Sequence, residues 1–215
     1  MTPPVRDGGT RQQECGVRCG GLRADAVRNR RRIRTAAADL LAEQGAAVSL
    51  DRIARLAGVS NATLYRHYGS REELLTDVAE EVAAVAAAAE ARLSTCDPLV
   101  ALRGFLESLA TARPAALYCL PEGGGDGPAA GSGPRARVAA AAWRLLSRAQ
   151  RAGRVREDAT AEDLLAVVSQ LGRPLPGTTW RATDERCPRL VRQYLEGLVL
   201  PVPRVSHEPY HLPRR

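Results

Sequence analysis

The stretch SLDRIARLAGVSNATLYRHY, from Ser49 to Tyr68, decides the fold. Ser49 and Ser60 are residue types that cap helix N-termini, and they predict one short helix over 50–57 and a second from Ser60 to about Tyr68. Gly58, between the two helices, suits a turn with positive φ. Two short helices joined by such a turn are typical of a helix-turn-helix, whose second helix enters the DNA major groove.

The spacing of three residues supports this motif. Ala54 is small where the two helices would cross, Gly58 follows four residues later, and Leu64 would face back into the core ten residues after Ala54. Three further apolar residues complete the small core: Ile53, Ala57 and Val59. A purely structural corner of two helices has the same spacing, so spacing alone leaves both readings open.

The outward residues favour DNA binding over a structural corner. The second helix would present polar or small side chains suited to base edges and phosphates, namely Asn61, Ala62, Thr63, Tyr65, Arg66 and His67. Five arginines crowd the start of the preceding helix with no acidic residue between them: Arg28, Arg30, Arg31, Arg32 and Arg34. Since most of them cannot be buried, we expect them to reach backbone phosphates.

The remaining sequence predicts an all-α fold, because no segment alternates with period two. An apolar stripe predicts a helix over 24–44 that ends at Gly45, and the capping box Ser70-Arg71-Glu72-Glu73 opens a long helix to about Leu93. Further helices are predicted over 98–111, 114–120, 135–152, 161–171 and 185–200. The Gly/Pro-rich segment 121–134 is predicted to be a loop.

Charge and composition set the class of partner. The net charge is +7, and all 31 basic residues are arginine. Residues 1–75 carry 13 arginines against 8 acidic residues, whereas the rest carries 18 against 16, so the positive excess lies near the N-terminus, as a polyanionic partner requires. No apolar run reaches transmembrane length and the N-terminus lacks a signal-peptide core, which predicts a cytoplasmic protein without membrane contact.

A helical enzyme is the competing class, and the sequence disfavours it. The five cysteines are scattered and are expected to be free thiols, and no nucleophile elbow, phosphate loop or dinucleotide fingerprint occurs. His207 and His211 have metal-ligand spacing, but Pro209 between them disfavours a helix. We therefore expect no catalytic residue, no metal and no cofactor.

The stretch from Arg23 to about Glu81 closely resembles the N-terminal domain of the tetracycline-repressor (TetR) family. The residues that carry the resemblance are 30–38 leading to LLAEQG at 40–45, IARLAGVS at 53–60, TLYRHY at 63–68 and SREELL at 70–75. The departures are mild, since the family often has Lys where Arg71 stands and Phe where Tyr68 stands. The resemblance covers about a quarter of the chain.

The resemblance implies a homodimer, a repressor more often than an activator, whose two recognition helices enter successive major grooves of a palindromic operator. The half-sites would lie about one helical turn apart, roughly 34–36 Å, or somewhat more. The implied DNA contacts are Ser49, Ser60, Asn61, Ala62, Thr63, Tyr65, Arg66, His67 and Arg71, with Arg28 and Arg31 from the arginine run. Arg71 would hold a phosphate at a helix N-terminus.

The predicted organisation is a tail over 1–21, a helix-turn-helix domain over 22–70, a C-terminal helical effector-binding and dimerisation domain over 71–200, and a tail over 201–215. Candidate liners of a small-molecule pocket are Phe105, Tyr118, Cys119 and Trp143, although each is also a plausible core aromatic or thiol. A regulator without an effector remains the alternative, and a pocket filled by the chain's own side chains would favour it.

The last two helices are expected to pair across the dimer as a four-helix bundle. Their apolar stripes consist of Leu164, Leu165, Val168, Leu190, Val191, Tyr194 and Leu198. The same stripes could instead form core within one chain.

Overall fold

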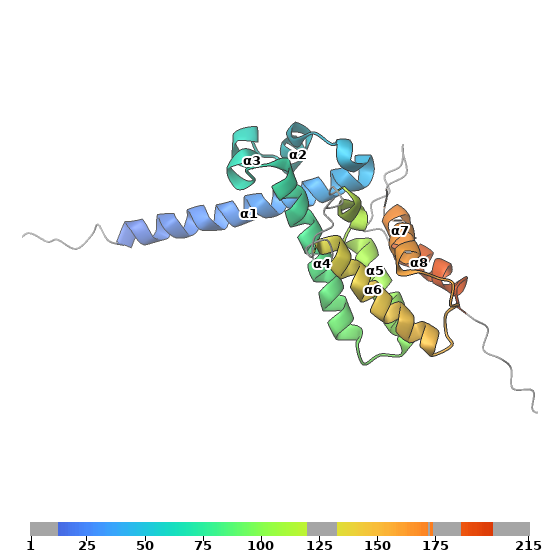
Figure 1. Ribbon diagram of the computed structural model, residues 1–215. Coiled ribbons are helices and arrows are strands. Elements are labelled where there is room, and N and C mark those ends of the chain that lie inside the picture. Colours follow the sequence, from blue (N-terminus) through green and yellow to red (C-terminus); the bar gives the residue numbers. More distant parts are fainter. Residues whose placement is uncertain (1–12, 120–132, 172, 174–185, 200–215) are drawn as a thin grey trace, which may run out of the picture.

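The computed structural model describes residues 13–119, 133–171, 173 and 186–199 (Figure 1). Over these residues the chain forms eight α-helices, two short 3-10 helices and no strand, apart from one bridge between Val155 and Val199. The all-α prediction is confirmed. The elements are α1 Gln13–Gln44, η1 Gly45–Ala47, α2 Leu50–Ala57, α3 Asn61–His67, α4 Arg71–Leu93, α5 Pro98–Thr111, η2 Pro114–Tyr118, α6 Pro134–Arg151, α7 Ala161–Leu171 and α8 Arg186–Glu196.

The N-terminal unit, which we call the head, consists of α1, η1, α2 and α3. Figure 1 shows α2 and α3 together on one side of α1, and α4 packs against α1. Its core is contributed by every α-helix of the head, and its largest members have almost no exposed area: Ile33, Leu41, Ile53, Leu64 and Tyr68. Burial of each such side chain stabilises the fold by about 1.5–3 kcal/mol relative to exposure.

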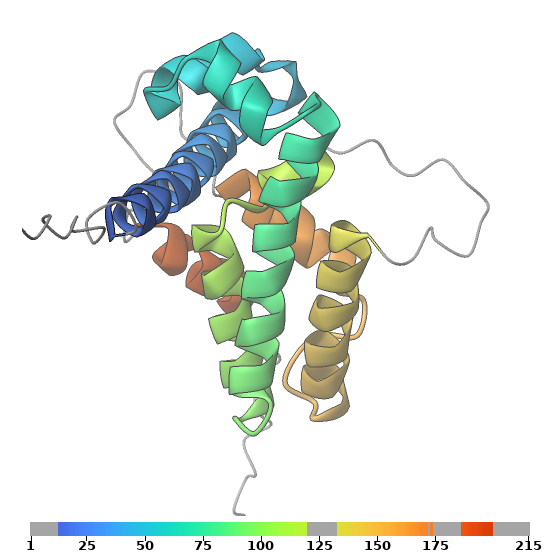
Figure 2. The ribbon, with the colours of Figure 1, turned by 90° about the vertical axis from the view of Figure 1, so that its left-hand side faces the viewer.

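Helix α4 joins the head to the second unit. The Ser70 hydroxyl accepts a hydrogen bond from the amide of Glu73, as the predicted capping box requires. The Glu73 carboxylate accepts from the amide of Gly69, at 2.7 Å, where a standard capping box would use the amide of Ser70. Figure 2 shows the helix running from the head down the length of the second unit, so both units share one rigid element.

The second unit, which we call the body, consists of α5, η2, α6, α7 and α8 packed around the lower part of α4. Its core is apolar and dense, with Leu102, Phe105, Leu106, Leu109 and Val138 all at 0% exposure. The body helices were predicted from their apolar stripes. The bounds of α5 and α7 agree with that prediction, because Pro98 and the Asp97 cap mark the start of α5 and Thr160 bonds with Asp163 at the start of α7.

Three predicted boundaries differ from the structure. Helix α1 begins at Gln13 and not at Ala24, so part of the predicted N-terminal tail is helical. The segment predicted as a helix over 114–120 is a 3-10 helix, because Arg113 adopts a left-handed conformation (φ 56°) and turns the chain sharply after α5. The last predicted helix ends at Glu196.

Some predictions concern residues outside the described ranges: the rest of the N-terminal tail, most of the Gly/Pro-rich loop, and the C-terminal tail with His207 and His211. Among the residues that are described, none of the helices combines the length and hydropathy needed to cross a bilayer.

Candidate nucleic-acid interface

The turn between α2 and α3 is built as the sequence predicts. The hydroxyl of Ser49 caps α2 by accepting from the amide of Arg52 at 3.3 Å, and the hydroxyl of Ser60 caps α3 by accepting from the amide of Thr63 at 3.2 Å. Gly58 ends α2 in the left-handed region, with φ 63°. Three residues therefore separate the two helices, which keeps α3 at a fixed angle to α2.

The inner side of this motif is held by small and apolar contacts. Ala54 and Leu64 are each 1% exposed, and Ile53 and Ala57 are buried beside them. Leu64 is the only residue of α3 that is fully buried, so it anchors the helix and leaves the remainder at the surface. The predicted helix-turn-helix is confirmed.

The outer side of α3 faces away from the protein. Asn61, Ala62, Tyr65 and Arg66 are exposed, with Tyr65 at 55%, whereas Thr63 and His67 are half-buried. An exposed aromatic ring on a short helix gains little from the fold itself. This side of α3 is therefore free for a partner.

The polar side chains of α3 are held in place by one another and by α2. The amide nitrogen of Asn61 donates to the carboxylate of Asp51, and the Ser60 and Thr63 hydroxyls lie 2.9 Å apart. The guanidinium of Arg66 donates to the Thr63 hydroxyl at 3.3 Å. Because these contacts restrain the side chains before binding, less conformational entropy is lost when they meet a partner.

The sequence did not single out Asp51. Asp51 lies in the first turn of α2, ten residues before Asn61. This spacing is the signal from which its contact with Asn61 could have been predicted. The contact leaves the amide oxygen of Asn61 and its second N–H for a base edge.

Most of the arginine run has a structural role, which corrects our expectation. Arg30 donates to Asp77 of α4 at 3.2 Å, Arg34 donates to Glu81 of α4 at 3.2 Å, and Arg32 reaches the carbonyl of Gly58 at 3.4 Å. The arginines and acids each stand four apart on facing helices, so the two rows match in register.

Arg28 and Arg31, the two arginines of this run that we expected to contact DNA, differ from each other. Arg28 forms an exposed ion pair with Asp25 on the preceding turn of α1. Arg31 is exposed and makes no side-chain hydrogen bond or ion pair within the ranges that the structure covers. Arg31 is therefore the better candidate for a phosphate contact.

Arg71 also differs from expectation. Its guanidinium is half-buried and donates to the carbonyl oxygens of Ala46 and Val48, in the segment between α1 and α2. The side chain reaches back across the head because these carbonyls, next to the short η1 helix, lack partners within a helix of their own. Arg71 therefore positions the start of α2, and its contact with a phosphate stays a prediction.

A buried network fixes the end of α3. The ring of Tyr68 is fully buried, its hydroxyl donates to Asp77 at 2.6 Å, and the guanidinium of Arg30 lies 4.9 Å from the ring centroid. Partial burial raises the pKa of Asp77, but the hydrogen bonds from Tyr68 and Arg30 outweigh it and hold that pKa below its usual value. The carboxylate therefore links α1, α3 and α4 in its charged form.

The four candidate ligand-binding residues do not share one pocket. Phe105 is at 0% exposure in the body core, and Trp143 is 62% exposed on the outer face of α6 beside Arg144, Ser147 and Arg148. Phe105 is therefore a core residue, whereas Trp143 lines a separate surface pocket on α6, and its role in ligand binding stays a prediction. Tyr118 and Cys119 do line a common pocket, between the head and the body.

Four of the predicted dimer contacts are core residues of the single chain: Leu164, Leu165, Val168 and Val191, all at 3% exposure or less. The prediction of an interface is wrong for them, and the alternative of core within one chain applies. Leu190, Tyr194 and Leu198 are only partly buried.

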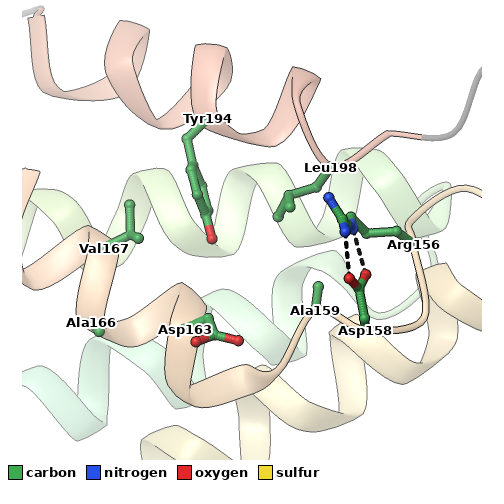
Figure 3. A pocket seen from close by; sticks show the side chains of 8 residues that line it. All are labelled: Arg156, Asp158, Ala159, Asp163, Ala166, Val167, Tyr194 and Leu198. Carbon is green, nitrogen blue, oxygen red and sulfur yellow. Dashed lines mark hydrogen bonds and ion pairs between the residues drawn. The ribbon is translucent and has the colours of Figure 1, made fainter.

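A groove of about 310 Å³ lies on the outer side of α7 and α8. In Figure 3 the ring of Tyr194 extends from α8 toward α7, between Val167 and Leu198, with the ion pair of Arg156 and Asp158 at one end. Ala166, exposed on α7, completes the apolar part of this surface.

Comparisons with known proteins agree with this architecture. The family model described as bacterial regulatory proteins, tetR family, matches residues 33–78, and the model described as transcriptional regulator SbtR-like, C-terminal domain, matches residues 97–199. A search of curated proteins gives no significant match.

Several solved structures are similar. A TetR transcription regulatory protein from Mycobacterium vanbaalenii is 33% identical, over 83% of this chain and 99% of its own, with a TM-score of 0.48. The TetR family regulator PfmR from Thermus thermophilus is 29% identical, over 77% and 95%, with a TM-score of 0.50. A gamma-butyrolactone receptor described as ArpA-like is 20% identical, over 84% and 92%, with a TM-score of 0.55.

The first family model covers the helix-turn-helix, and the second covers the body, so together they match well over half of the chain. They establish that this protein belongs to the TetR family of bacterial transcriptional regulators, which bind DNA and are not enzymes.

Proposed function

We propose that this regulator is a homodimeric repressor that holds a palindromic operator through its two α3 helices and is released by a small-molecule effector. The observation that carries the proposal is the outer side of α3, where Asn61, Ala62, Tyr65 and Arg66 are exposed while Leu64 anchors the helix. The B-DNA major groove is about 12 Å wide and admits one such helix.

The exposed side chains divide into two roles by chemistry. Asn61, Thr63 and Arg66 carry donors and acceptors that read base edges, and Ala62 is small enough to contact a thymine methyl group. Phosphates are contacted by Tyr65 and His67 from α3, by the exposed N-caps Ser49 and Ser60, and by Arg31 and Arg28 of α1. These are the sequence-independent contacts that set register and salt dependence.

The apolar surface on α7 and α8 supports dimerisation. Tyr194 and Leu198 are partly exposed from α8, and Ala166 and Val167 border the same groove from α7. A two-fold axis through this surface lets the same patch on both chains meet, as a closed dimer requires. Two heads in one dimer then reach two half-sites, roughly 34–36 Å apart or somewhat more.

Effector release requires a pocket that accepts a small molecule. The centre of the body is filled by side chains such as Phe105, Leu102 and Leu106, which favours the alternative of a regulator without an effector. A gamma-butyrolactone receptor has a similar fold, but at 20% identity this likeness shows the fold alone. The class of effector therefore follows from the pockets of this chain and their lining residues.

Operator binding tests the proposal with matched variants. The chain is titrated against its own promoter fragment, and binding is followed by fluorescence anisotropy at several salt concentrations. We expect log K to fall with log salt by about 0.9 for each phosphate neutralised. Replacing a base-reading residue, as in Arg66→Ala or Asn61→Ala, should cost about 1–3 kcal/mol and relax the preference for operator over random DNA.

Arg31→Ala should weaken binding to all sequences about equally and reduce the salt slope by about one. The control is Arg151→Ala, which removes an exposed arginine from α6 in the body and should leave affinity unchanged. If Arg66→Ala and Asn61→Ala bind the operator like the parent protein, α3 is not the recognition helix.

A further inference from the structure

The pocket that contains Tyr118 and Cys119 lies where the head meets the body. It has a volume of about 180 Å³. The end of α1 and η1 contribute lining residues from the head. Lining residues from the body come from η2, from α7 and from the residues that follow these two helices. The nine residues are Leu41, Gly45, Ala46, Ala115, Tyr118, Cys119, Ser169, Gln170 and Arg173. Any molecule in this pocket would touch both units.

The pocket lining is partly apolar and partly polar. Leu41, Ala46 and Ala115 contribute hydrocarbon. Other lining residues contribute a phenol, a thiol, a hydroxyl, an amide and a guanidinium. A ligand that suits this lining is amphipathic, with a small apolar part and one polar group.

Ser169 is the most unusual member of the polar lining. It is 6% exposed, its hydroxyl oxygen is fully buried, and that oxygen makes no hydrogen bond within the described part of the chain. Burial raises the pKa of the Tyr118 phenol, and contact with the Ser169 hydroxyl partly opposes that increase, so the two groups lie close together. A buried polar group without a well-formed hydrogen bond typically costs about 1–3 kcal/mol, and a ligand satisfies this oxygen once the Ser169 side chain turns toward the pocket.

Tyr118 is held in place from outside the pocket. The guanidinium of Arg135 lies 4.6 Å from the centroid of its ring, and Arg135 is itself ion-paired with Glu162 at 2.7 Å. The cation over the ring face restrains the phenol in its position in the polar lining.

The electrostatics favour an anion. None of the nine lining residues is acidic, and Arg173 is cationic. Burial raises the pKa of the Cys119 thiol, and the positive charges of Arg71 and Arg173 partly oppose that increase. Asp39 of α1, two residues before the lining residue Leu41, is ion-paired with Arg113 at 2.5 Å.

We propose that this pocket is the effector site and that it takes a small monocarboxylate, with a single ring or a short chain as its apolar part. The inference rests on the proposed function, in which a small-molecule effector releases the repressor from its operator. A cavity of about 150 Å³ holds one benzene ring, so 180 Å³ suits a ring with one carboxylate. The carboxylate accepts hydrogen bonds from Ser169 and Tyr118 and pairs with Arg173, while the ring packs on Leu41 and Ala115.

The same pocket is connected to the DNA-binding helices. Ala46 lines it, and the carbonyl of Ala46 accepts from Arg71, which also holds the carbonyl of Val48. Val48 directly precedes Ser49, the cap of α2. A ligand that displaces η1 therefore also displaces the start of α2, and with it α3.

The 3-10 helix η2 provides a second connection. Ala116 packs in the core of the head, and the next residue, Leu117, packs in the core of the body. A ligand against η2 therefore acts on both cores at once, and release needs no cavity in the centre of the body.

Direct binding tests the pocket without DNA. Benzoate is titrated into the full chain by isothermal titration calorimetry, with benzamide as an uncharged ligand of the same size. We expect benzoate to bind with a Kd of about 1 mM or tighter, as a ligand of about nine non-hydrogen atoms permits, and benzamide at least about fivefold more weakly. Absence of benzoate binding at concentrations up to about 10 mM would overturn the site.

Two variants locate the bound carboxylate. Arg173→Gln should raise the Kd for benzoate about tenfold, because an ion pair to a partly buried group is lost, whereas Arg151→Gln on α6 should leave it unchanged. Ser169→Ala should weaken benzoate binding about fivefold and raise the Tm of the free protein by about 2–4 °C, because it removes the unsatisfied hydroxyl. Equal affinity in both variants and the parent overturns the assignment.

Coupling to DNA is measured separately. Saturating benzoate should lower operator affinity at least about tenfold in the parent protein and not in Arg173→Gln, with operator affinity in the absence of ligand the same for both. If benzoate binds and operator affinity does not change, the coupling is wrong. If the free protein does not bind its operator, the proposed function fails whatever the calorimetry shows, so the two failures are distinguishable.

Discussion

At the scale of single residues, the phenol of Tyr68 is the most informative group. It is buried, donates to Asp77 and lies under Arg30. We predict that Tyr68→Phe keeps the fold and lowers the free energy of unfolding by about 0.5–1.5 kcal/mol at pH 7, because one hydrogen bond is lost while Asp77 keeps its contact with Arg30. Urea denaturation measures the change.

The pH dependence of the same variant gives a second readout. Burial and the hydrogen bond to Asp77 raise the pKa of Tyr68 in the folded state above its usual value of about 10. The corresponding stability is complete below about pH 10 and is lost as the pH rises above it, since the unfolded phenol ionises first. Tyr68→Phe should therefore lose less stability above about pH 10 than the parent. The exposed Tyr65→Phe is the control, and an unchanged alkaline loss in Tyr68→Phe would contradict the network.

At the scale of elements, the turn between α2 and α3 depends on Gly58. With φ 63°, an alanine there is strained by about 1–2 kcal/mol. An added Cβ would also collide with an outer nitrogen of Arg32, but that side chain is flexible and can move aside. We predict that Gly58→Ala lowers the free energy of unfolding by about 1–2 kcal/mol, almost all of it from the backbone.

The matched control for that prediction is Gly45→Ala. Gly45 has φ 68° and its added Cβ would meet nothing within 4 Å, so it isolates the backbone strain. The two variants should agree within about 0.5 kcal/mol in chemical denaturation. A Gly58→Ala loss that is larger by several kcal/mol would show that Arg32 is rigidly held against the turn.

Elements with a local signal could be predicted from the sequence. Ser49, Ser60 and Ser70 are N-caps, and each accepts a hydrogen bond from the amide three residues later. Each signal therefore lies within four consecutive residues. The bounds of α2 and α4 follow from them. Contacts between distant segments carry no such signal: nothing near Arg30 in the sequence shows that Asp77 lies opposite, and nothing near Arg71 shows that its target is the carbonyl of Ala46.

The candidate sites follow the same rule. The outer side of α3 was predictable, because the anchor Leu64 fixes which side of a short helix is buried. The pocket residues Ser169, Gln170 and Arg173 were not, because they meet η1 only through the packing of α7 against η2. An apolar stripe such as that of Leu164 shows that a helix is buried on one side, and does not show whether a neighbouring helix or a second chain covers it.

At the scale of the whole molecule, one head alone contacts one half-site, so the proposal requires two chains held in fixed relation. The surface of Ala166, Val167, Tyr194 and Leu198 is the candidate contact (Figure 3). We predict that Val167→Asp combined with Tyr194→Asp shifts the protein from twice 23.0 kDa to the mass of one chain, because two unpaired carboxylates would be buried on each side of the interface. Sedimentation equilibrium measures the mass.

The same double variant should bind the operator about 100-fold or more weakly, since the second half-site is then no longer contacted at high effective concentration. Its affinity for a single half-site should match that of the parent protein, because no residue of the head is changed. Trp143→Asp is the control: it also places a carboxylate on an exposed apolar position, but on α6, and should leave both mass and operator affinity unchanged. A double variant that still sediments as two chains would move the interface elsewhere, and a parent protein that sediments as one chain would remove the geometric basis for a palindromic operator.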